Sequence, residues 1–284
     1  MEIEILRPHG FCAGVTGALR KALRLEGRGA SAEAGRLFCL HELVHNEIVV
    51  GDMRRRGFEF IEDIDEVPDG ATILFSAHGV SPAVRARAAE KGLSVVDATC
   101  PFVARVHEAA RSFAERGLAV VIIGKASHAE VAGLLGEAPG ARVVGSVDEA
   151  AALDCHGEAI GVVSQTTMNA DDVERIVAAL RARFKVEAAA AVCNATKERQ
   201  DAVKAFDGDA LLVLGSATSS NTRRLCEVAR TRAFRAGTMD EVRALDLAGV
   251  ARLGVTSGAS TPETFLEEAV NYLRGGKHDR TEEQ

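Results

Sequence analysis

The segment LSVVDATCPFVARVHEAARSF, residues 93–113, contains the unit from which this fold is built. Its first part is a short β-branched run that ends at Asp97-Ala98-Thr99-Cys100. Its second part repeats apolar residues at the i, i+3, i+4, i+7 spacing of a helix with one apolar face. The segment therefore predicts a strand that turns directly into a helix, with Cys100 at the turn.

The same pattern recurs along the chain, where nine short apolar runs end in small or polar residues and lead into amphipathic segments. Repetition of this kind predicts βα units and parallel sheets. The polar clusters that follow the runs would then lie at the carboxyl ends of strands, where ligands bind in such sheets. The nine predicted strands are residues 3–6, 36–40, 71–75, 93–96, 119–124, 159–163, 188–192, 210–215 and 252–256.

Cys12, Cys100 and Cys193 are 88 and 93 residues apart, and each follows an apolar run and opens a segment with helical periodicity. This period predicts three similar α/β domains, with small mostly parallel sheets, in a pseudo-threefold trefoil. We expect the strand ends to point inward, so that the three thiols converge on a central cluster. The predicted domains are residues 14–99, residues 100–189, and residues 190–284 together with 1–13.

Three converging thiolates suit an iron–sulfur cluster, although such clusters usually take four cysteines. One iron would then lack a protein ligand. The alternative is that these cysteines are small buried apolar residues, which is a common fate of a free cysteine. Cys39, Cys155 and Cys226 do not share the position at a strand end, and we interpret them as structural.

Composition and charge disfavour two classes of protein, those that bind nucleic acid and those that span a membrane. The chain has 284 residues, a net charge of −7, 4% aromatic residues and no Trp, which disfavours nucleic-acid binding. No apolar run approaches the roughly 20 residues of a membrane span. The first residues lack the pattern of a secretory signal, so we expect a cytoplasmic protein in which six cysteines are ligands or buried residues rather than disulfide partners.

His41-Glu42-Leu43-Val44-His45 matches the H-E-x-x-H pattern of zinc proteases. That chemistry needs a helix that places both imidazoles on one face, and a third ligand downstream. Residues 36–40 instead predict a strand that runs directly into His41. We therefore interpret the match as a coincidence.

Glu130 follows Ser127-His128-Ala129, and S-x-x-E is also a capping box, in which the glutamate only satisfies a helix N-terminus. The alternative is that Glu130, beside His128 at a strand end, delivers protons to a bound substrate. Ser260-Thr261-Pro262-Glu263 presents the same ambiguity.

Ser219-Ser220-Asn221 follows a strand that ends in glycine and precedes a helical segment. These side chains and the backbone N–H groups of a helix start could hold a phosphate, although a plain N-cap uses the same residue types. The predicted topology brings Ser260 and three histidines, His45, His78 and His128, to the same side. Together they indicate a site for a polyanion.

These motifs together resemble the 4-hydroxy-3-methylbut-2-enyl diphosphate reductase family, over about residues 10–260. The motifs that carry the resemblance are Gly10-Phe11-Cys12-Ala13-Gly14-Val15, His41 to Asn46, Ser76-Ala77-His78-Gly79-Val80-Ser81, Asp97-Ala98-Thr99-Cys100-Pro101, Gln165-Thr166-Thr167, Cys193-Asn194-Ala195-Thr196, Ser219-Ser220-Asn221 and Gly258-Ala259-Ser260. The departures are small: among them, Ala129 stands where proline is frequent, and Thr218 where asparagine is common.

The resemblance implies a 4Fe–4S cluster held by Cys12, Cys100 and Cys193, and the last step of the non-mevalonate isoprenoid pathway. It implies that Glu130 is the proton donor, assisted by Thr166, with His128 beside it. Reduced ferredoxin or flavodoxin would supply the electrons. The residues that it assigns to the diphosphate are His45, His78, His128, Ser219, Ser220, Asn221 and Ser260, with Thr166 also at the substrate.

Three other functions stay open at this point. A quinolinate-synthase-like dehydratase also uses three cysteines, but needs no net electrons. A zinc protease would use His41 and His45 and would be colourless. An iron–sulfur sensor or carrier would keep the cluster without binding allylic diphosphates.

Overall fold

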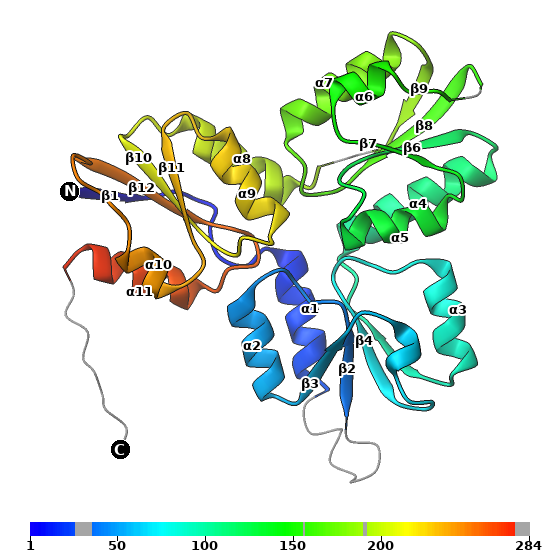
Figure 1. The fold of residues 1–284 in the computed structure, drawn as a ribbon, viewed down its shortest axis with the longest axis horizontal. Coiled ribbons are helices and arrows are strands. Elements are labelled where there is room, and N and C mark those ends of the chain that lie inside the picture. The colour runs from blue at the N-terminus through cyan, green and yellow to red at the C-terminus, as the bar shows by residue number, and fades with distance from the viewer. Residues whose placement is uncertain (26–35, 156, 190–191, 276–284) are drawn as a thin grey trace. The chain divides into compact units, whose positions relative to one another are not determined.

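Three sheets of four strands each make up the described part of the computed structural model, which covers residues 1–25, 36–155, 157–189 and 192–275 (Figure 1). All neighbouring strands in these sheets are parallel. The predicted α/β class is therefore confirmed. Among the described residues, no helix combines the length and apolar character that crossing a bilayer requires.

The sheet from the first third of the chain has the strand order β3-β2-β4-β5. Alternate residues such as Phe38, Leu40, Ile73 and Phe75 pack together on one face, as the two-residue period of a strand requires. Its strands are β2 (Leu37–Leu40), β3 (Phe58–Ile61), β4 (Thr72–Phe75) and β5 (Ser94–Asp97), and the segment also contains helices α1 (Ala13–Leu23), α2 (Glu47–Arg55) and α3 (Pro82–Glu90) and the 3-10 helix η1 (Ile64–Glu66).

The second sheet has the order β7-β6-β8-β9 and is covered on both faces (Figure 1). Val121 and Ile123 pack toward the side of α7, whereas Val120 and Ile122 pack toward α4 and α5. Its strands are β6 (Ala119–Ile123), β7 (Arg142–Val144), β8 (Ala159–Ser164) and β9 (Lys185–Ala188), and its helices are α4 (Pro101–Glu115), α5 (Ala129–Glu137), α6 (Val147–Ala151) and α7 (Ala170–Arg181).

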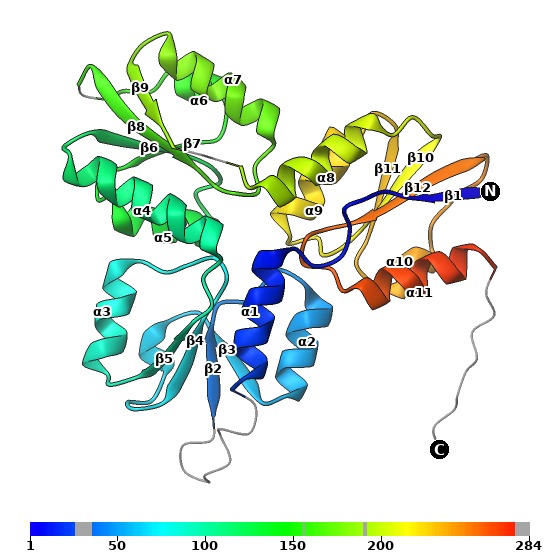
Figure 2. The same cartoon turned by 180° about the vertical axis from the view of Figure 1, so that it is seen from behind.

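The third sheet has the order β1-β12-β10-β11, so the first strand of the chain completes a sheet made by its last third. Figure 2 shows α8 and α9 on one face and α10 and α11 on the other. Leu212 and Leu214 face the α11 side, and Leu211 and Val213 the α9 side. The strands are β1 (Glu2–Ile5), β10 (Ala210–Leu214), β11 (Arg232–Ala236) and β12 (Arg252–Ser257), and the helices are α8 (Asn194–Ala205), α9 (Ser220–Val228), α10 (Met239–Arg243) and α11 (Glu263–Leu273).

The three sheets share one topology. In each, the first strand (β2, β6 or β10) lies between the second strand, which is at an edge (β3, β7 or β11), and the third strand (β4, β8 or β12). The strands that the nine-run prediction missed are these second strands, β3, β7 and β11. They are short and carry charged residues, as edge strands often do, so their hydrophobic signal is weak.

The strand before Cys193 was placed wrongly at residues 188–192. It is β9, which ends at Ala188, and residues 190 and 191 of the predicted run lie outside the described residues.

The described chain divides into two compact units, which we describe separately. The first unit comprises residues 1–12, residues 45–49 and the described residues from 198 onward, and contains the third sheet. The second unit comprises the described residues of 13–44 and 50–197, and contains the other two sheets. The division into three domains and the convergence of the three thiols both stay predictions.

Candidate active site

Cys100 and Cys193, both in the second unit, each lie at the start of a helix. Cys100 is the N-cap of α4, and its N–H donates to the carbonyl of Ala77 at 3.1 Å. Cys193 directly precedes α8, and its N–H donates to the carbonyl of Thr166 at 3.1 Å. A helix N-terminus stabilises a thiolate, so both sulfur atoms are placed where a metal ligand would be favoured.

Cys12, in the first unit, lies in the same local setting. It directly precedes α1, and its N–H donates to the carbonyl of Ala259 at 3.0 Å. All three thiols are half-buried and reduced. The prediction that each of these cysteines opens a helical segment is confirmed.

The remaining cysteines have different surroundings. Cys39 is fully buried within β2, and burial raises the pKa of its thiol far above the ordinary value. Burial also raises the pKa of Cys226, within α9, to about 11. Neither thiol would ionise readily near neutral pH, which supports a structural role. Cys155 lies in the segment between α6 and β8, as expected.

Glu130 is 1% exposed in the first turn of α5, and Thr166 binds its carboxyl group. The Thr166 N–H donates to Oε1 at 2.7 Å, and the Thr166 hydroxyl lies 3.1 Å from Oε2. Burial raises the pKa of Glu130 to about 7, and the two bonds from Thr166 oppose that rise. A carboxyl group with this pKa can both hold and release a proton at neutral pH.

The capping-box alternative for Glu130 is wrong. The N-cap of α5 is His128, whose Nδ1 accepts the N–H of Glu130 at 3.1 Å, while the Glu130 carboxyl turns toward Thr166. His128 lies beside His78, with ring centroids 5.5 Å apart in an edge-to-face arrangement. The second unit therefore brings together Glu130, Thr166, His128 and His78.

The sequence did not indicate a buried pair of side chains, His107 and Glu137, which lies against the turn that contains His78. His107 on α4 is 6% exposed, and its Nδ1 lies 3.1 Å from Oε1 of Glu137 on α5. Gly79 has φ +76°, and a Cβ there would lie 2.8 Å from His107 Nε2, so only glycine fits between the turn and the ring. Burial lowers the pKa of His107, against the effect of Glu137. The partners are 30 residues apart, so no local motif indicates them.

A cavity of about 230 Å³ in the second unit borders both Thr166 and Cys193. Phe102 and Arg105 of α4 line it, and Phe102 is 40% exposed. The apolar repeat after Cys100 in the sequence includes Phe102, but this side chain is exposed rather than packed in the core. The cavity gives a small molecule room beside the residue that binds Glu130.

The first unit presents Ser219, Ser220 and Asn221 at the start of α9. Ser219 is the N-cap and accepts the N–H of Thr222 at 3.3 Å, so the plain N-cap interpretation holds for this one residue. Asn221 is 4% exposed, and its Oδ1 and Nδ2 have no hydrogen-bond partner among the described residues. A buried amide in that state needs a partner that the described chain does not provide, and a bound ligand is one.

Ser260 donates a hydrogen bond to the carbonyl of His45 at 3.0 Å, also within the first unit. The capping-box alternative for residues 260–263 is wrong, because α11 begins at Glu263 after Pro262 and the Glu263 carboxyl binds His9 Nδ1 at 3.0 Å. The first unit therefore brings His45 and Ser260 together.

The H-E-x-x-H stretch is not helical, because residues 41–46 precede α2 and His41 has φ +58°. His41 Nδ1 lies 2.7 Å from a carboxylate oxygen of Glu62. The two imidazoles therefore lack the helix that a zinc protease of this class needs.

A family model described as LytB protein matches residues 3–274. Two curated proteins are named 4-hydroxy-3-methylbut-2-enyl diphosphate reductase: one from Acidithiobacillus ferrooxidans is 39% identical over 97% of this chain and 89% of its own length. The other, from Mycobacterium bovis and numbered 2, is 43% identical over 96% of this chain and 87% of its own length.

Two solved structures are also similar to this chain. The E-1-hydroxy-2-methyl-but-2-enyl-4-diphosphate reductase from Plasmodium falciparum matches with a TM-score of 0.88 and 33% identity, over 96% of this chain and 87% of that one. A structure titled (E)-4-hydroxy-3-methyl-but-2-enyl diphosphate reductase, the terminal enzyme of the non-mevalonate pathway, matches with a TM-score of 0.64 and 30% identity, over 97% of this chain and 100% of that one.

Proposed function

This chain belongs to the LytB protein family, and we propose that it reduces (E)-4-hydroxy-3-methylbut-2-enyl diphosphate to isopentenyl and dimethylallyl diphosphate. The reaction removes the allylic hydroxyl group as water. It consumes two electrons and two protons, of which one proton goes to the leaving oxygen and the other to carbon. The protein must therefore hold a diphosphate, receive electrons and deliver a proton to one particular oxygen.

We propose that Cys12, Cys100 and Cys193 hold a 4Fe–4S cluster. The donor set fits, because each is a reduced, half-buried thiol at the start of a helix, whereas Cys39 and Cys226 are held as protonated thiols by burial. A bound cluster of this kind supplies electrons one at a time and, at an iron without a protein ligand, Lewis acidity toward the substrate oxygen.

Glu130 would supply the proton that lets the hydroxyl group leave as water. Burial raises the pKa of its carboxyl group to about 7, so the group can hold a proton near neutral pH and release it to the substrate. Thr166 holds both carboxyl oxygens, so the direction of the group is fixed before the substrate arrives. This buried carboxyl group, held at both oxygens by Thr166, is the observation that carries the proposed function.

The diphosphate would bind at the N-terminus of α9 and beside the histidines. Ser219, Ser220 and Asn221 offer side chains at a helix start, where backbone N–H groups favour an anion. Ser260 and three histidines would complete the site, because a hydroxyl group and imidazole N–H groups can donate hydrogen bonds to an anion. These residues are His45, His78 and His128.

Electrons would come from reduced ferredoxin or flavodoxin in the cytoplasm. The six cysteines are free thiols in the structure, which agrees with a reducing compartment.

The test is anaerobic incubation of the cluster-containing protein with the allylic diphosphate and a reduced dye, followed by analysis of the C5 diphosphates. We expect isopentenyl and dimethylallyl diphosphate to form in proportion to the electrons supplied. A dehydratase would act without reductant. Turnover that does not depend on reductant, or no C5 product from cluster-loaded protein, would rule the proposal out.

A further inference from the structure

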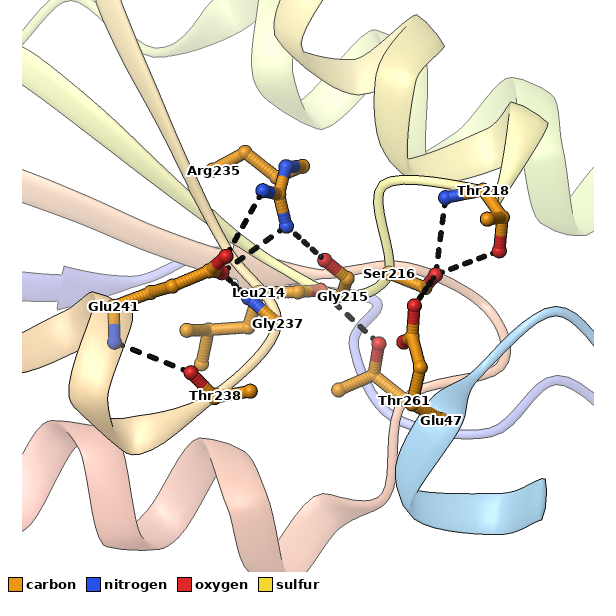
Figure 3. Close-up of polar contacts among 10 residues, drawn as sticks. All are labelled: Glu47, Leu214, Gly215, Ser216, Thr218, Arg235, Gly237, Thr238, Glu241 and Thr261. Atoms are coloured by element: carbon orange, nitrogen blue, oxygen red, sulfur yellow. Dashed lines mark hydrogen bonds and ion pairs between the residues drawn. The ribbon is translucent and has the colours of Figure 1, made fainter. Parts of the chain in front are cut away.

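The loop between β10 and α9, which leads to Ser219, is anchored by a carboxylate from another part of the chain. Ser216, 1% exposed, donates its hydroxyl proton to Oε1 of Glu47 at 2.7 Å (Figure 3). The same Ser216 oxygen accepts the N–H of Thr218 at 3.0 Å and lies 2.8 Å from the Thr218 hydroxyl. Because the Ser216 proton points to Glu47, the Thr218 hydroxyl is the donor in that last contact.

Two more side chains in Figure 3 hold the strand end that precedes this loop. Arg235 Nη1 donates to the carbonyl of Gly215 at 3.3 Å and is itself paired with Glu241 at 3.2 Å. Thr261 donates to the carbonyl of Leu214 at 3.0 Å. Both anchors come from the same segment of chain as the loop, whereas Glu47 is separated from Ser216 by 169 residues.

Glu47 belongs to residues 45–49, which we call the His45 arm, and which are part of the first unit. Two hydroxyl groups bind the arm to the rest of that unit, since Ser260 binds the His45 carbonyl and Ser216 binds Glu47. The Asn46 side chain accepts the N–H groups of Ile48 and Val49 at 3.1 and 3.2 Å, which fixes the start of α2 and with it Glu47. The arm thus presents both His45 and the carboxylate that anchors the loop.

We propose that Glu47 is a positioning residue for the diphosphate. Through Ser216 it fixes the turn that leads into Ser219, Ser220 and Asn221, and it joins that turn to the arm that carries His45. The inference rests on the proposed function, because it assigns Glu47 to the same anion site.

Because Glu47 carries a carboxylate, the direction of the change in diphosphate affinity on its removal tests this proposal. A carboxylate beside the loop of an anion site would, by Coulomb repulsion alone, weaken binding of a diphosphate, so that its removal would strengthen binding. A positioning carboxylate gives the opposite result, because its removal releases Ser216 and the turn. The sign of the change in affinity therefore separates the two roles.

The experiment measures the Kd of inorganic diphosphate by calorimetry, and KM and kcat in the anaerobic assay, for cluster-loaded protein. We expect Glu47→Ala to raise Kd and KM about tenfold, as the loss of a hydrogen bond to a charged group implies, with kcat changed less than about twofold. Glu47→Gln keeps an acceptor for Ser216, so it should stay within about threefold of the parent protein. Asp240→Ala, which removes an exposed carboxylate of the same unit, is the matched control and should change none of Kd, KM and kcat.

Ser216→Ala removes the contact with Glu47 from the other side. It replaces Glu47→Ala in the experiment if the Glu47→Ala protein does not fold. It should reproduce the rise in Kd and KM, and the double variant should be no worse than Ser216→Ala alone, because the contact with Glu47 is already absent in that variant. A lower or unchanged Kd in Glu47→Ala or Ser216→Ala would overturn the positioning role while the parent protein still binds diphosphate. A parent protein that neither binds diphosphate nor turns over would overturn the proposed function, and this inference with it.

Discussion

Glu130 in the second unit and Asn221 in the first are both almost completely buried, but their polar atoms are in opposite situations. Both oxygens of Glu130 accept hydrogen bonds from Thr166, whereas the Asn221 amide has no partner among the described residues. A group that donates a proton needs a fixed direction and a raised pKa, and its own unit provides both. A group that binds substrate can instead wait for the ligand to complete its hydrogen bonds.

Glu130→Gln tests the proton-donating side of this comparison and has the largest expected effect. The amide keeps the shape of the side chain and an acceptor for Thr166, but it cannot release a proton to the leaving hydroxyl group. We expect kcat to fall by about 10²- to 10⁴-fold, while the Kd of inorganic diphosphate changes less than about threefold. Glu108→Gln, at an exposed position of α4, is the control. A Glu130→Gln protein that keeps more than a tenth of the activity would remove Glu130 from this role.

Asn221→Ala tests the substrate-binding side. We expect KM to rise about 10- to 100-fold, because a hydrogen bond to a charged ligand is lost, without a decrease in Tm, because the deleted amide has no partner in the described structure.

Asn169→Ala is the matched control for Asn221→Ala. Asn169 caps α7 and accepts the N–H of Asp171 at 3.0 Å, so its loss should destabilise the protein by about 1 kcal/mol and leave KM unchanged. If both variants lowered Tm and neither changed KM, the distinction between the two asparagines would fail.

The pH dependence of stability tests the raised pKa of Glu130 without the substrate. The folded protein keeps the Glu130 proton up to about pH 7, whereas the unfolded chain releases it near pH 4.5. The folded state therefore binds more protons within this window, and this contribution to the free energy of unfolding is lost as the pH rises. Relative to Glu130→Gln, the parent protein should lose about 3 kcal/mol between pH 4 and pH 8.

Thermal unfolding of both proteins across that pH range is the measurement. A constant difference in Tm between them would show that the pKa of Glu130 is not raised.

Local sequence pattern was sufficient for the cysteines, because a β-branched run followed by helical periodicity fixes a strand-to-helix turn wherever it occurs, as at Cys100. Local sequence pattern did not predict the contacts of a side chain whose partner is far away in the sequence. The S-x-x-E motif at Glu130 is compatible with a capping box, and only Thr166, 36 residues away, turns the carboxyl group from the helix end. The His107 and Glu137 pair, and the contact between Glu47 and Ser216, likewise depend on tertiary structure that no short motif contains.

The edge strands were missed for a different physical reason. β11 reads Arg-Ala-Phe-Arg-Ala and β7 has three residues, so neither gives the continuous apolar run typical of a central strand. The strand before Cys193 was displaced because an alanine-rich run resembles a buried strand, while the residues that pair with β8 are Lys185 to Ala188.

The central claim is that Cys12, Cys100 and Cys193 hold one cluster, and iron and acid-labile sulfide in anaerobically purified variants test this claim most directly. We predict that Cys12→Ser, Cys100→Ser and Cys193→Ser each lose the brown chromophore and most of the bound iron, and that Cys155→Ser keeps both. A Cys12→Ser protein with the full iron and sulfide content of the parent would contradict the account, because Cys12 would then not be a cluster ligand.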